Sequence, residues 1–177
     1  MFNSESYWND RYKTGGTSGP GSYNENAKIK ADIINDFVSS NSINTVTDFG
    51  CGDGNQLKHF NFNEYLGYDI SDVILGKTSK IFSDDSTKEF KHIREYKNNP
   101  SDLAMSLEVI LHQVNDSDYI EYMDRLLNHN SKYLIVQTIK TDIEKQTHIH
   151  VKNRDTLNYI LDNSDYKLLS DTNVFIT

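Results

Sequence analysis

The feature that most constrains this chain is a short apolar stretch that runs directly into a turn with three glycines. Residues 45–54 read Thr-Val-Thr-Asp-Phe-Gly-Cys-Gly-Asp-Gly. The first half predicts a buried strand at 45–49, and glycine at alternate positions lets the backbone take positive φ and lets a ligand approach it closely. We expect a short helix near 54–60. A strand, a bare turn and a helix N-terminus together predict a nucleotide-binding corner.

The rest of the chain alternates segments with strand and helix patterns. A helix over 25–40 follows from amphipathic spacing, and Ser22 and Glu25 fit a capping box at its start. Further strands are expected at 65–70, 89–93, 102–107 and 133–137, further helices from a Ser71 cap to about 81, at 115–128 and near 154–162, and a closing antiparallel hairpin at 166–170 and 174–177. This alternation predicts a doubly wound α/β sheet.

Length and composition limit the class of protein. A length of 177 residues predicts one domain, in which 1–42 forms an aromatic and Gly-rich arm and a capping helix. A formal net charge of −8 argues against a nucleic-acid binder. The sequence shows neither an apolar run of membrane-helix length nor a signal-peptide pattern. Its single cysteine, Cys51, fits a reducing compartment, so we expect a cytoplasmic protein.

The N-terminal residues 1–22 combine aromatic rings with a Gly- and Ser-rich run. Tyr7, Trp8 and Tyr12 fall close together and include the chain's only tryptophan. Flexible tails seldom concentrate such rings, so we expect an arm or lid that packs on the site; a partly ordered tail is the alternative.

The spacing of the glycines separates kinds of nucleotide. The dinucleotide fingerprint is G-x-G-x-x-G, whereas this turn reads G-x-G-x-G and has Asn55 where the third dinucleotide glycine would stand. Asp69 ends the second predicted strand, about twenty residues after Gly50, where an acid can accept hydrogen bonds from both ribose hydroxyls. A carboxylate that caps the helix after Ser71 is a compatible alternative.

Three segments resemble the motifs of class I S-adenosylmethionine-dependent methyltransferases. Residues 46–54 look like the first motif, 68–71 resemble the acidic second motif, and 102–112 are similar to the fourth-strand segment that ends in a histidine. The resemblance covers roughly 44–140. It implies a Rossmann-like, mostly parallel sheet of about seven strands, the last one antiparallel, with S-adenosyl-L-methionine lying across the strand ends. The third strand departs from the pattern, since it lacks an Asp followed by an apolar residue to hold the adenine; residues 94–96 or the backbone of 106–107 are alternatives.

From the motifs and the aromatic arm we expect a set of cofactor-binding residues. Asp48 would fix the turn or hold the cofactor's ammonium group, the glycines would pass close to the methionine and the sugar, and aromatic faces would suit the sulfonium cation. The expected residues are Asp48, Gly50, Cys51, Gly52, Gly54, Asp69, Ile70, Ser106, Leu107, Trp8 and Tyr12.

His112 is the best candidate for a general base, because it follows the fourth strand and an imidazole titrates near pH 6.5. A histidine that merely packs in the first turn is the alternative. Glu108 is a second candidate, or a carboxylate that orients the acceptor. His148, His150 and Arg154 are expected acceptor contacts. A metal pair or a plain surface are the other interpretations of the two histidines, and we expect no metal.

Three functions compete at this point. The first is O-methylation of a small molecule or saccharide, favoured by the compact chain and by the lack of an Asn-Pro-Pro-aromatic motif after the fourth strand. The second is a protein or RNA methyltransferase that holds its substrate with the arm and residues 140–154. The third is a binding module that keeps the cofactor fold without catalysis. The sequence leaves the acceptor and the oligomeric state open.

Overall fold

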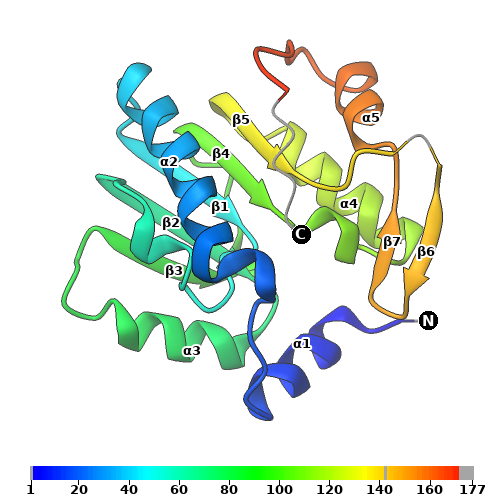
Figure 1. The fold of residues 1–177 in the computed structure, drawn as a ribbon, viewed down its shortest axis with the longest axis horizontal. Helices are drawn as coiled ribbons and strands as arrows, with labels where there is room; N and C mark the ends of the chain where they lie inside the picture. Colours follow the sequence, from blue (N-terminus) through cyan, green and yellow to red (C-terminus); the bar gives the residue numbers. More distant parts are fainter. Residues whose placement is uncertain (1, 142, 172–177) are drawn as a thin grey trace.

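The structure is a computed structural model that describes residues 2–141 and 143–171. Its main sheet has five parallel strands in the order β3-β2-β1-β4-β5 (Figure 1). The strands are β1 (Thr45–Phe49), β2 (Glu64–Asp69), β3 (Lys88–His92), β4 (Ser101–Leu107), β5 (Ser131–Gln137), β6 (Lys145–His148) and β7 (Val151–Asn153). The α-helices are α1 (Ser4–Lys13), α2 (Asn24–Ser40), α3 (Asp72–Ile81), α4 (Asp116–Leu127) and α5 (Thr156–Asp162). Single 3-10 turns are η1 (Pro20–Ser22), η2 (Leu57–His59), η3 (Ile93–Glu95) and η4 (Ile110–His112).

The central strand β1 explains why helices cover both faces of the sheet. Successive side chains of a strand point to opposite faces. Val46 packs in a cluster with Ile34 of α2, whereas Phe49 packs in a second cluster with Met123 and Leu126 of α4. A strand that is apolar on both sides is typical of a parallel sheet covered by helices, so the predicted doubly wound arrangement is confirmed.

The order of the strands places the candidate site. The chain builds β1, β2 and β3 outward in one direction and then returns to lay β4 on the other side of β1. Ligands of such sheets bind at this reversal, outside the carboxyl ends of the strands. The glycine turn follows β1 and residues 108–112 follow β4, so both segments meet at that point.

The sheet differs from the expectation of about seven strands. The described residues contribute five strands to it, all parallel, and β6 and β7 form a separate antiparallel hairpin. Residues 166–170 were expected as a strand but are irregular. Leu168 and Leu169 are exposed, so the segment has no buried apolar face that would favour a strand, and it contacts β5 through the Tyr166 hydroxyl, which donates to the Ser131 carbonyl. The expected strand at 174–177 lies outside the described residues.

The expected helix after the glycine turn is also wrong. Only the single 3-10 turn η2 forms there, since the amide side chains of the segment reach back to the N-terminal part of the chain. Asn55 Nδ2 donates to the Ser22 carbonyl at 2.7 Å, and Gln56 Nε2 donates to the Ala27 carbonyl at 2.7 Å. The glycine turn therefore has no helix N-terminus of its own.

The predicted helix over 25–40 is present as α2, but the capping box is not. The residue that precedes α2 is Tyr23, whose side chain makes no capping bond, and Ser22 belongs to the 3-10 turn η1. The helix α2 therefore begins without a hydrogen bond from a capping side chain. By contrast, Ser71 caps α3 as expected, accepting from the Ile74 N–H.

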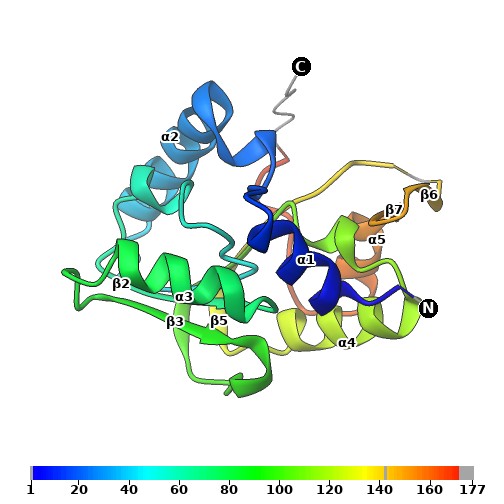
Figure 2. The same ribbon diagram turned by 90° about the horizontal axis from the view of Figure 1, so that it is seen from below.

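The N-terminal residues form an ordered arm. Figure 2 shows α1 lying between α3 and the β6–β7 hairpin. Tyr12 is buried in this packing at 3% exposure. Among the described helices, none combines the length and the apolar character needed to cross a membrane.

Candidate functional site

The glycine turn needs glycine for both backbone and steric reasons. Gly50, Gly52 and Gly54 have φ values of 96°, 56° and 70°, in the left-handed region that side chains disfavour. A Cβ at position 50 would overlap the Val109 side chain, and a Cβ at position 52 would overlap the Ser18 hydroxyl. The turn is thus packed between the segment after β4 and the N-terminal arm.

Asp69 holds the turn against the end of β2. One carboxylate oxygen accepts from the Gly52 N–H and the other from the Ser71 N–H, each at 2.9 Å. Beside it, the N–H groups of Gly50 and Cys51 both donate to the Tyr68 carbonyl. Burial raises the pKa of the Asp69 carboxyl, against the lowering effect of the backbone N–H bonds. Each carboxylate oxygen has a second lone pair, so it can accept a further hydrogen bond from a ribose hydroxyl.

Asp48 is a buried acid with one free oxygen. Its Oδ2 accepts from the Tyr65 hydroxyl at 2.7 Å, and among the described residues its Oδ1 has no hydrogen-bond partner. Burial raises the Asp48 pKa to about 7, while the Tyr65 bond and the charge of Lys30 act in the opposite direction. A buried carboxyl oxygen without a partner is costly unless a ligand satisfies it.

Lys30 of α2 adds a buried cation to the site. Its side chain is 5% exposed, and its ammonium lies 2.8 Å from Glu108 Oε2. Glu108 itself has a φ of 60°, which is unusual for a residue with a side chain, and Gly21 packs directly against its carboxylate. Such strained backbone is found preferentially at functional sites. Glu108 was among the residues expected from the sequence, whereas Lys30 was not.

His112 lies in the turn η4 that follows β4, in contact with the rings of His150 and Trp8. Its Nδ1 donates to the His150 carbonyl at 2.7 Å, so the neutral ring keeps its lone pair on Nε2. The His150 ring stacks on it with centroids 5.4 Å apart, and Trp8 meets it edge-on at 5.0 Å. Burial lowers the pKa of His112, which keeps the ring neutral at pH 7. A neutral imidazole with a free Nε2 can accept a proton.

The three expected acceptor contacts separate in space. His150 reaches the His112 ring and also stacks on Tyr7 of α1 at 4.9 Å, whereas His148 is exposed on β6. Arg154 is 7% exposed, and its guanidinium donates to the Gln113 carbonyl at 2.6 Å and to Asp116 at 2.7 Å. The structure therefore brings only His150 beside His112.

The N-terminal arm is tied to the glycine turn by a pair of reciprocal hydrogen bonds. The Ser18 N–H donates to Asp53 Oδ2 and the Asp53 N–H donates to Ser18 Oγ, both at 2.9 Å. The hydroxyl of Tyr23 donates to the same carboxylate at 2.8 Å, and the Tyr12 hydroxyl lies 3.1 Å from Ser18 Oγ. Sequence analysis missed these contacts, although an acid between two glycines of the turn was a visible signal.

The other expected cofactor residues take different positions. Trp8 stacks on Tyr12 with ring centroids 5.7 Å apart, and together they line the arm side of the site. Ile70 and Leu107 are half-buried. Ser106 is fully buried and its hydroxyl bonds to Tyr122 at 2.7 Å, so its side chain faces α4 rather than the site. Only its backbone remains available to a ligand.

A five-stranded sheet of this order, with a glycine turn, an acid after β2 and a histidine after β4, defines a Rossmann-like protein that binds a nucleotide cofactor at its strand ends. A family model described as a methyltransferase domain matches residues 47–135, half of the chain. The chain therefore belongs to this family, and it is a class I S-adenosylmethionine-dependent methyltransferase.

Solved structures share the fold at low sequence identity. Magnesium protoporphyrin IX methyltransferase (ChlM) of Synechocystis PCC 6803, solved with bound SAM, has a TM-score of 0.66 and 14% identity, with 94% of this chain and 88% of that chain covered. The N-methyltransferase NodS of Bradyrhizobium japonicum WM9, solved with S-adenosyl-L-homocysteine, has a TM-score of 0.59 and 13% identity, with 72% of this chain and 68% of that chain covered. The methyltransferase domain of bacterial CtHen1-C has a TM-score of 0.54 and 21% identity, with 64% of this chain covered. This chain spans 65% of the length of that domain. A search of curated proteins finds no match.

Proposed function

We propose that this protein transfers the methyl group of S-adenosyl-L-methionine to a hydroxyl group of a small molecule or saccharide, with His112 as the general base. The observation that carries the proposal is the 2.7 Å bond from His112 Nδ1 to the His150 carbonyl. It leaves the Nε2 lone pair free in a site that the cofactor turn adjoins. Hydroxyl acceptors need such a base because their proton must leave during the reaction.

The residues at the turn fit the cofactor. The buried Asp48 Oδ1 lacks a partner within the described part of the chain, and the nearby Lys30 ammonium is buried at 5% side-chain exposure. These two groups would take the ammonium and the carboxylate of the methionine part. Asp69 would hold the ribose, the bare turn would pass beside the sugar, and the faces of Trp8 and Tyr12 suit a sulfonium cation. When bound, the cofactor supplies a methyl group activated by the positive sulfur.

The protein residues then position the acceptor and remove its proton. The acceptor oxygen would take the methyl group from the cofactor, whose sulfur would keep the electron pair of the broken carbon–sulfur bond, leaving S-adenosylhomocysteine. The hydroxyl proton passes to His112 Nε2 and later leaves to water. Glu108, held by Lys30 at 2.8 Å, would orient the acceptor. Because the donor is already activated, positioning supplies much of the acceleration.

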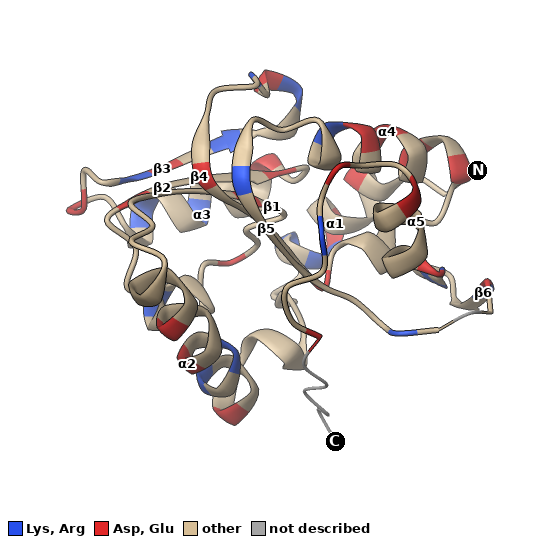
Figure 3. Ribbon diagram, turned by 90° about the horizontal axis from the view of Figure 1, so that it is seen from above, with Lys and Arg blue, Asp and Glu red and all other residues tan. Residues whose placement is uncertain are grey.

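The surroundings of His112 favour a small acceptor over a polymer. Tyr7 and Trp8 approach the histidine pair from α1, and His150 approaches from the hairpin, so rings enclose the base from two sides. A sugar or a small planar compound can pack against such faces. The net charge of −8 disfavours nucleic acid. The surface helix α4 is itself acidic, since Arg125 is its one basic residue beside Asp116, Asp118, Glu121 and Asp124 (Figure 3).

A screen with radiolabelled cofactor tests the proposal. The protein is incubated with pools of small hydroxyl compounds, saccharides, proteins and RNA, after calorimetry has measured the binding of S-adenosylhomocysteine. Label transferred to a hydroxyl compound supports the proposal. Label transferred only to protein or RNA would support the macromolecular alternative, and tight cofactor binding without any transfer would support the non-catalytic module. No binding of S-adenosylhomocysteine would contradict the whole assignment.

A further inference from the structure

A buried donor without a partner stands at the end of β3. His92 is 4% exposed, and among the described residues its Nε2 has no hydrogen-bond partner. Its Nδ1 accepts from the Arg94 N–H at 3.0 Å, so the neutral ring carries its proton on Nε2. Burying an unsatisfied donor of this kind is costly, and it calls for a ligand or a partner.

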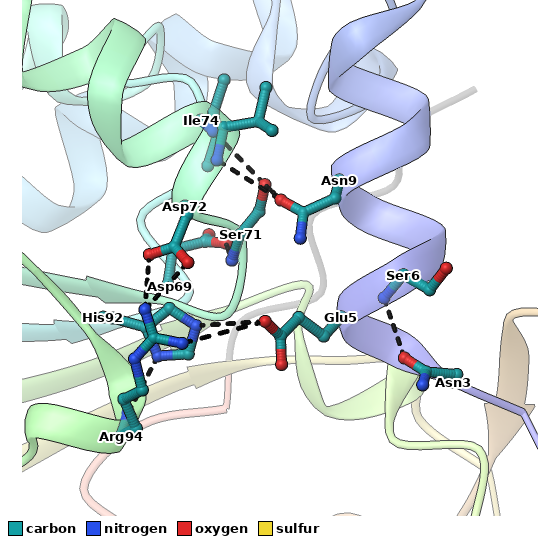
Figure 4. Close-up of polar contacts among 11 residues, drawn as sticks. Asn3, Glu5, Ser6, Asn9, Asp69, Ser71, Asp72, Ile74, His92 and Arg94 are labelled. Carbon is teal, nitrogen blue, oxygen red and sulfur yellow. Dashed lines mark hydrogen bonds and ion pairs between the residues drawn. The ribbon is translucent and has the colours of Figure 1, made fainter.

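The nearest acceptor comes from the N-terminal arm. Glu5 of α1 places Oε1 3.9 Å from His92 Nε2, too far for a hydrogen bond (Figure 4). Glu5 is half-exposed. The two side chains therefore present a donor and an acceptor next to each other at one edge of the site, without satisfying each other.

The position of this pair follows from the register of the strands. Asp69 of β2 is directly opposite His92 of β3 in the parallel ladder. The strands run in the order β4, β1, β2, β3 across this part of the sheet, so a cofactor whose methionine part lies at β1 and β4 and whose ribose lies at Asp69 of β2 would extend its base toward β3. His92 and Glu5 thus stand beside the expected place of the base.

A metal ion is a poorer occupant for this cluster. Ligand atoms of Glu5, Asp72 and His92 lie within 4.8 Å of one another. However, a metal on Nε2 would require the proton to sit on Nδ1, where the Arg94 N–H already points. Arg94 also forms two hydrogen bonds to the Asp72 carboxylate, at 3.0 and 2.8 Å, and so places a positive charge inside the cluster.

Adenine matches the pair in hydrogen-bonding pattern. It presents a ring nitrogen that accepts next to an amino group that donates. We infer that His92 Nε2–H and the Glu5 carboxylate read this edge of the cofactor's adenine, so that the N-terminal helix is part of the base-recognition site. This inference rests on the proposed cofactor. It gives the third strand, where the family pattern is missing, a recognition group from a distant part of the chain.

The arm is held in place for this role by a separate contact. Asn9 Oδ1 accepts from the Ser71 hydroxyl at 2.7 Å and from the Val73 N–H at 3.3 Å (Figure 4). Asn9 lies one helical turn after Glu5 on α1 and adds an acceptor to the N-terminus of α3. The docking of α1 therefore fixes the helix that carries Glu5 without using Glu5 itself.

The test compares two ligands that differ only at the base. Calorimetry measures the dissociation constants of S-adenosylhomocysteine and S-inosylhomocysteine, whose base carries an oxygen in place of the amino group. The unaltered protein is expected to prefer the adenosyl ligand about tenfold or more. Glu5→Gln, which can donate to that oxygen, is expected to reduce this preference several-fold. His92→Phe is expected to weaken adenosyl binding about tenfold.

Asp10→Asn is the matched control, since Asp10 is an exposed acid on the same helix. It is expected to change neither affinity. Equal binding of both ligands, unchanged in Glu5→Gln, would overturn this inference while leaving the proposed cofactor intact. Failure of the unaltered protein to bind S-adenosylhomocysteine would overturn the proposed function and this inference together. Circular dichroism of His92→Phe separates lost recognition from lost folding, and if that variant unfolds, the preference measured in Glu5→Gln decides alone.

Discussion

The backbone carbonyl of His150 accepts a hydrogen bond from His112 Nδ1 at 2.7 Å, so the tip of the β6–β7 hairpin sets the tautomer of the candidate base. Because the acceptor is a backbone atom, side-chain substitution at His150 leaves this bond in place. The base and its orienting group come from segments 38 residues apart in the chain. This separation explains why the sequence alone pointed to both histidines without revealing how they act together.

We first predict that His112→Ala keeps the cofactor affinity within about twofold but lowers turnover about a hundredfold or more. The variant removes the proton acceptor, whereas the turn that would hold the cofactor is untouched. Radiolabel transfer to the acceptor found by the screen measures turnover, and calorimetry measures affinity. An intact rate would show that His112 is not the base.

The pH profile of the unaltered protein gives a second view of the same residue. Burial lowers the His112 pKa below 6.5, and only the neutral ring can accept a proton. Turnover is therefore expected to stay level between pH 7 and 8 and to fall only below pH 6.5. A fall that begins above pH 7 would point to a different group.

Asp48→Asn is expected to change stability in a pH-dependent way. The folded pKa of about 7 lies above the ordinary aspartate value of 3.8, so the folded state binds more protons than the unfolded state between these two pH values. The stability that this group contributes is present below pH 3.8 and is lost as pH rises to about 7. Asparagine does not titrate, so the variant should melt about 5 °C or more higher at pH 8 and little differently at pH 4. Calorimetric melting checks this, and an equal shift at both pH values would exclude ionisation as the cause.

Two glycines, Gly52 in the turn and Gly76 in α3, offer a matched pair of substitutions. Gly52→Ala is expected to loosen the arm and weaken cofactor binding, since φ is 56° and the new Cβ would overlap Ser18. Gly76→Ala lies inside α3 with open space around it, and it should stabilise the protein by about 0.5–1 kcal/mol. Limited proteolysis of residues 14–22 reports the arm. Equal protection of the arm in both variants would contradict the packing role of Gly52.

The fold was predictable where the local pattern and the tertiary packing agree. Strands β1, β2 and β4 carry buried apolar residues, and β5 packs half-buried apolar residues against both core clusters. The positions of these four strands were expected to within a few residues. The prediction of a helix after the glycine turn was wrong because Asn55 and Gln56 hydrogen-bond to the N-terminal segment. These contacts join residues far apart in the chain, and the local sequence does not indicate them. The β6–β7 hairpin was not expected either, because its strands are only four and three residues long, with β6 exposed and β7 half-buried throughout, and so show no alternation of apolar and polar residues.

The site residues that belong to a sequence motif could be predicted, whereas those contributed by the N-terminal helices could not. Asp69 and the glycines of the turn were predicted from their spacing in the sequence. Lys30 and Glu5 look like ordinary helix residues in the sequence, and only the docking of α1 and α2 brings them to the strand ends. A charged residue on a helix gives no indication of which distant group it will face.

Arg154→Leu is expected to lower stability by about 2–4 kcal/mol, because the buried guanidinium bonds the Gln113 and Val114 carbonyls and Asp116. The variant would remove this donor from the Gln113 and Val114 carbonyls, whereas Asp116 would keep its hydrogen bond from Lys152. His148→Ala, at an exposed position, should change the melting temperature little. If Arg154→Leu melts normally and instead raises KM for the acceptor, Arg154 contacts the acceptor as the sequence predicted.

Lys30→Met is expected to reveal how the cofactor's methionine part is held. The buried ammonium contacts Glu108 at 2.8 Å and lowers the pKa of the nearby Asp48. The unaltered protein should bind S-adenosylhomocysteine more tightly than methylthioadenosine, which lacks the amino-acid part. Losing a charged hydrogen bond costs about 1.5–3 kcal/mol, so Lys30→Met should narrow this preference about tenfold or more.

Glu108→Gln is the control for that measurement, since it removes the charge of the partner and keeps its shape. It should leave the preference between the two ligands in place, because the Lys30 ammonium remains to meet the cofactor carboxylate. If Glu108→Gln narrows the preference as much as Lys30→Met does, the ion pair acts as one structural unit. In that case Lys30 positions Glu108 rather than contacting the cofactor, and a buried pair broken from either side would be expected to cost similar stability.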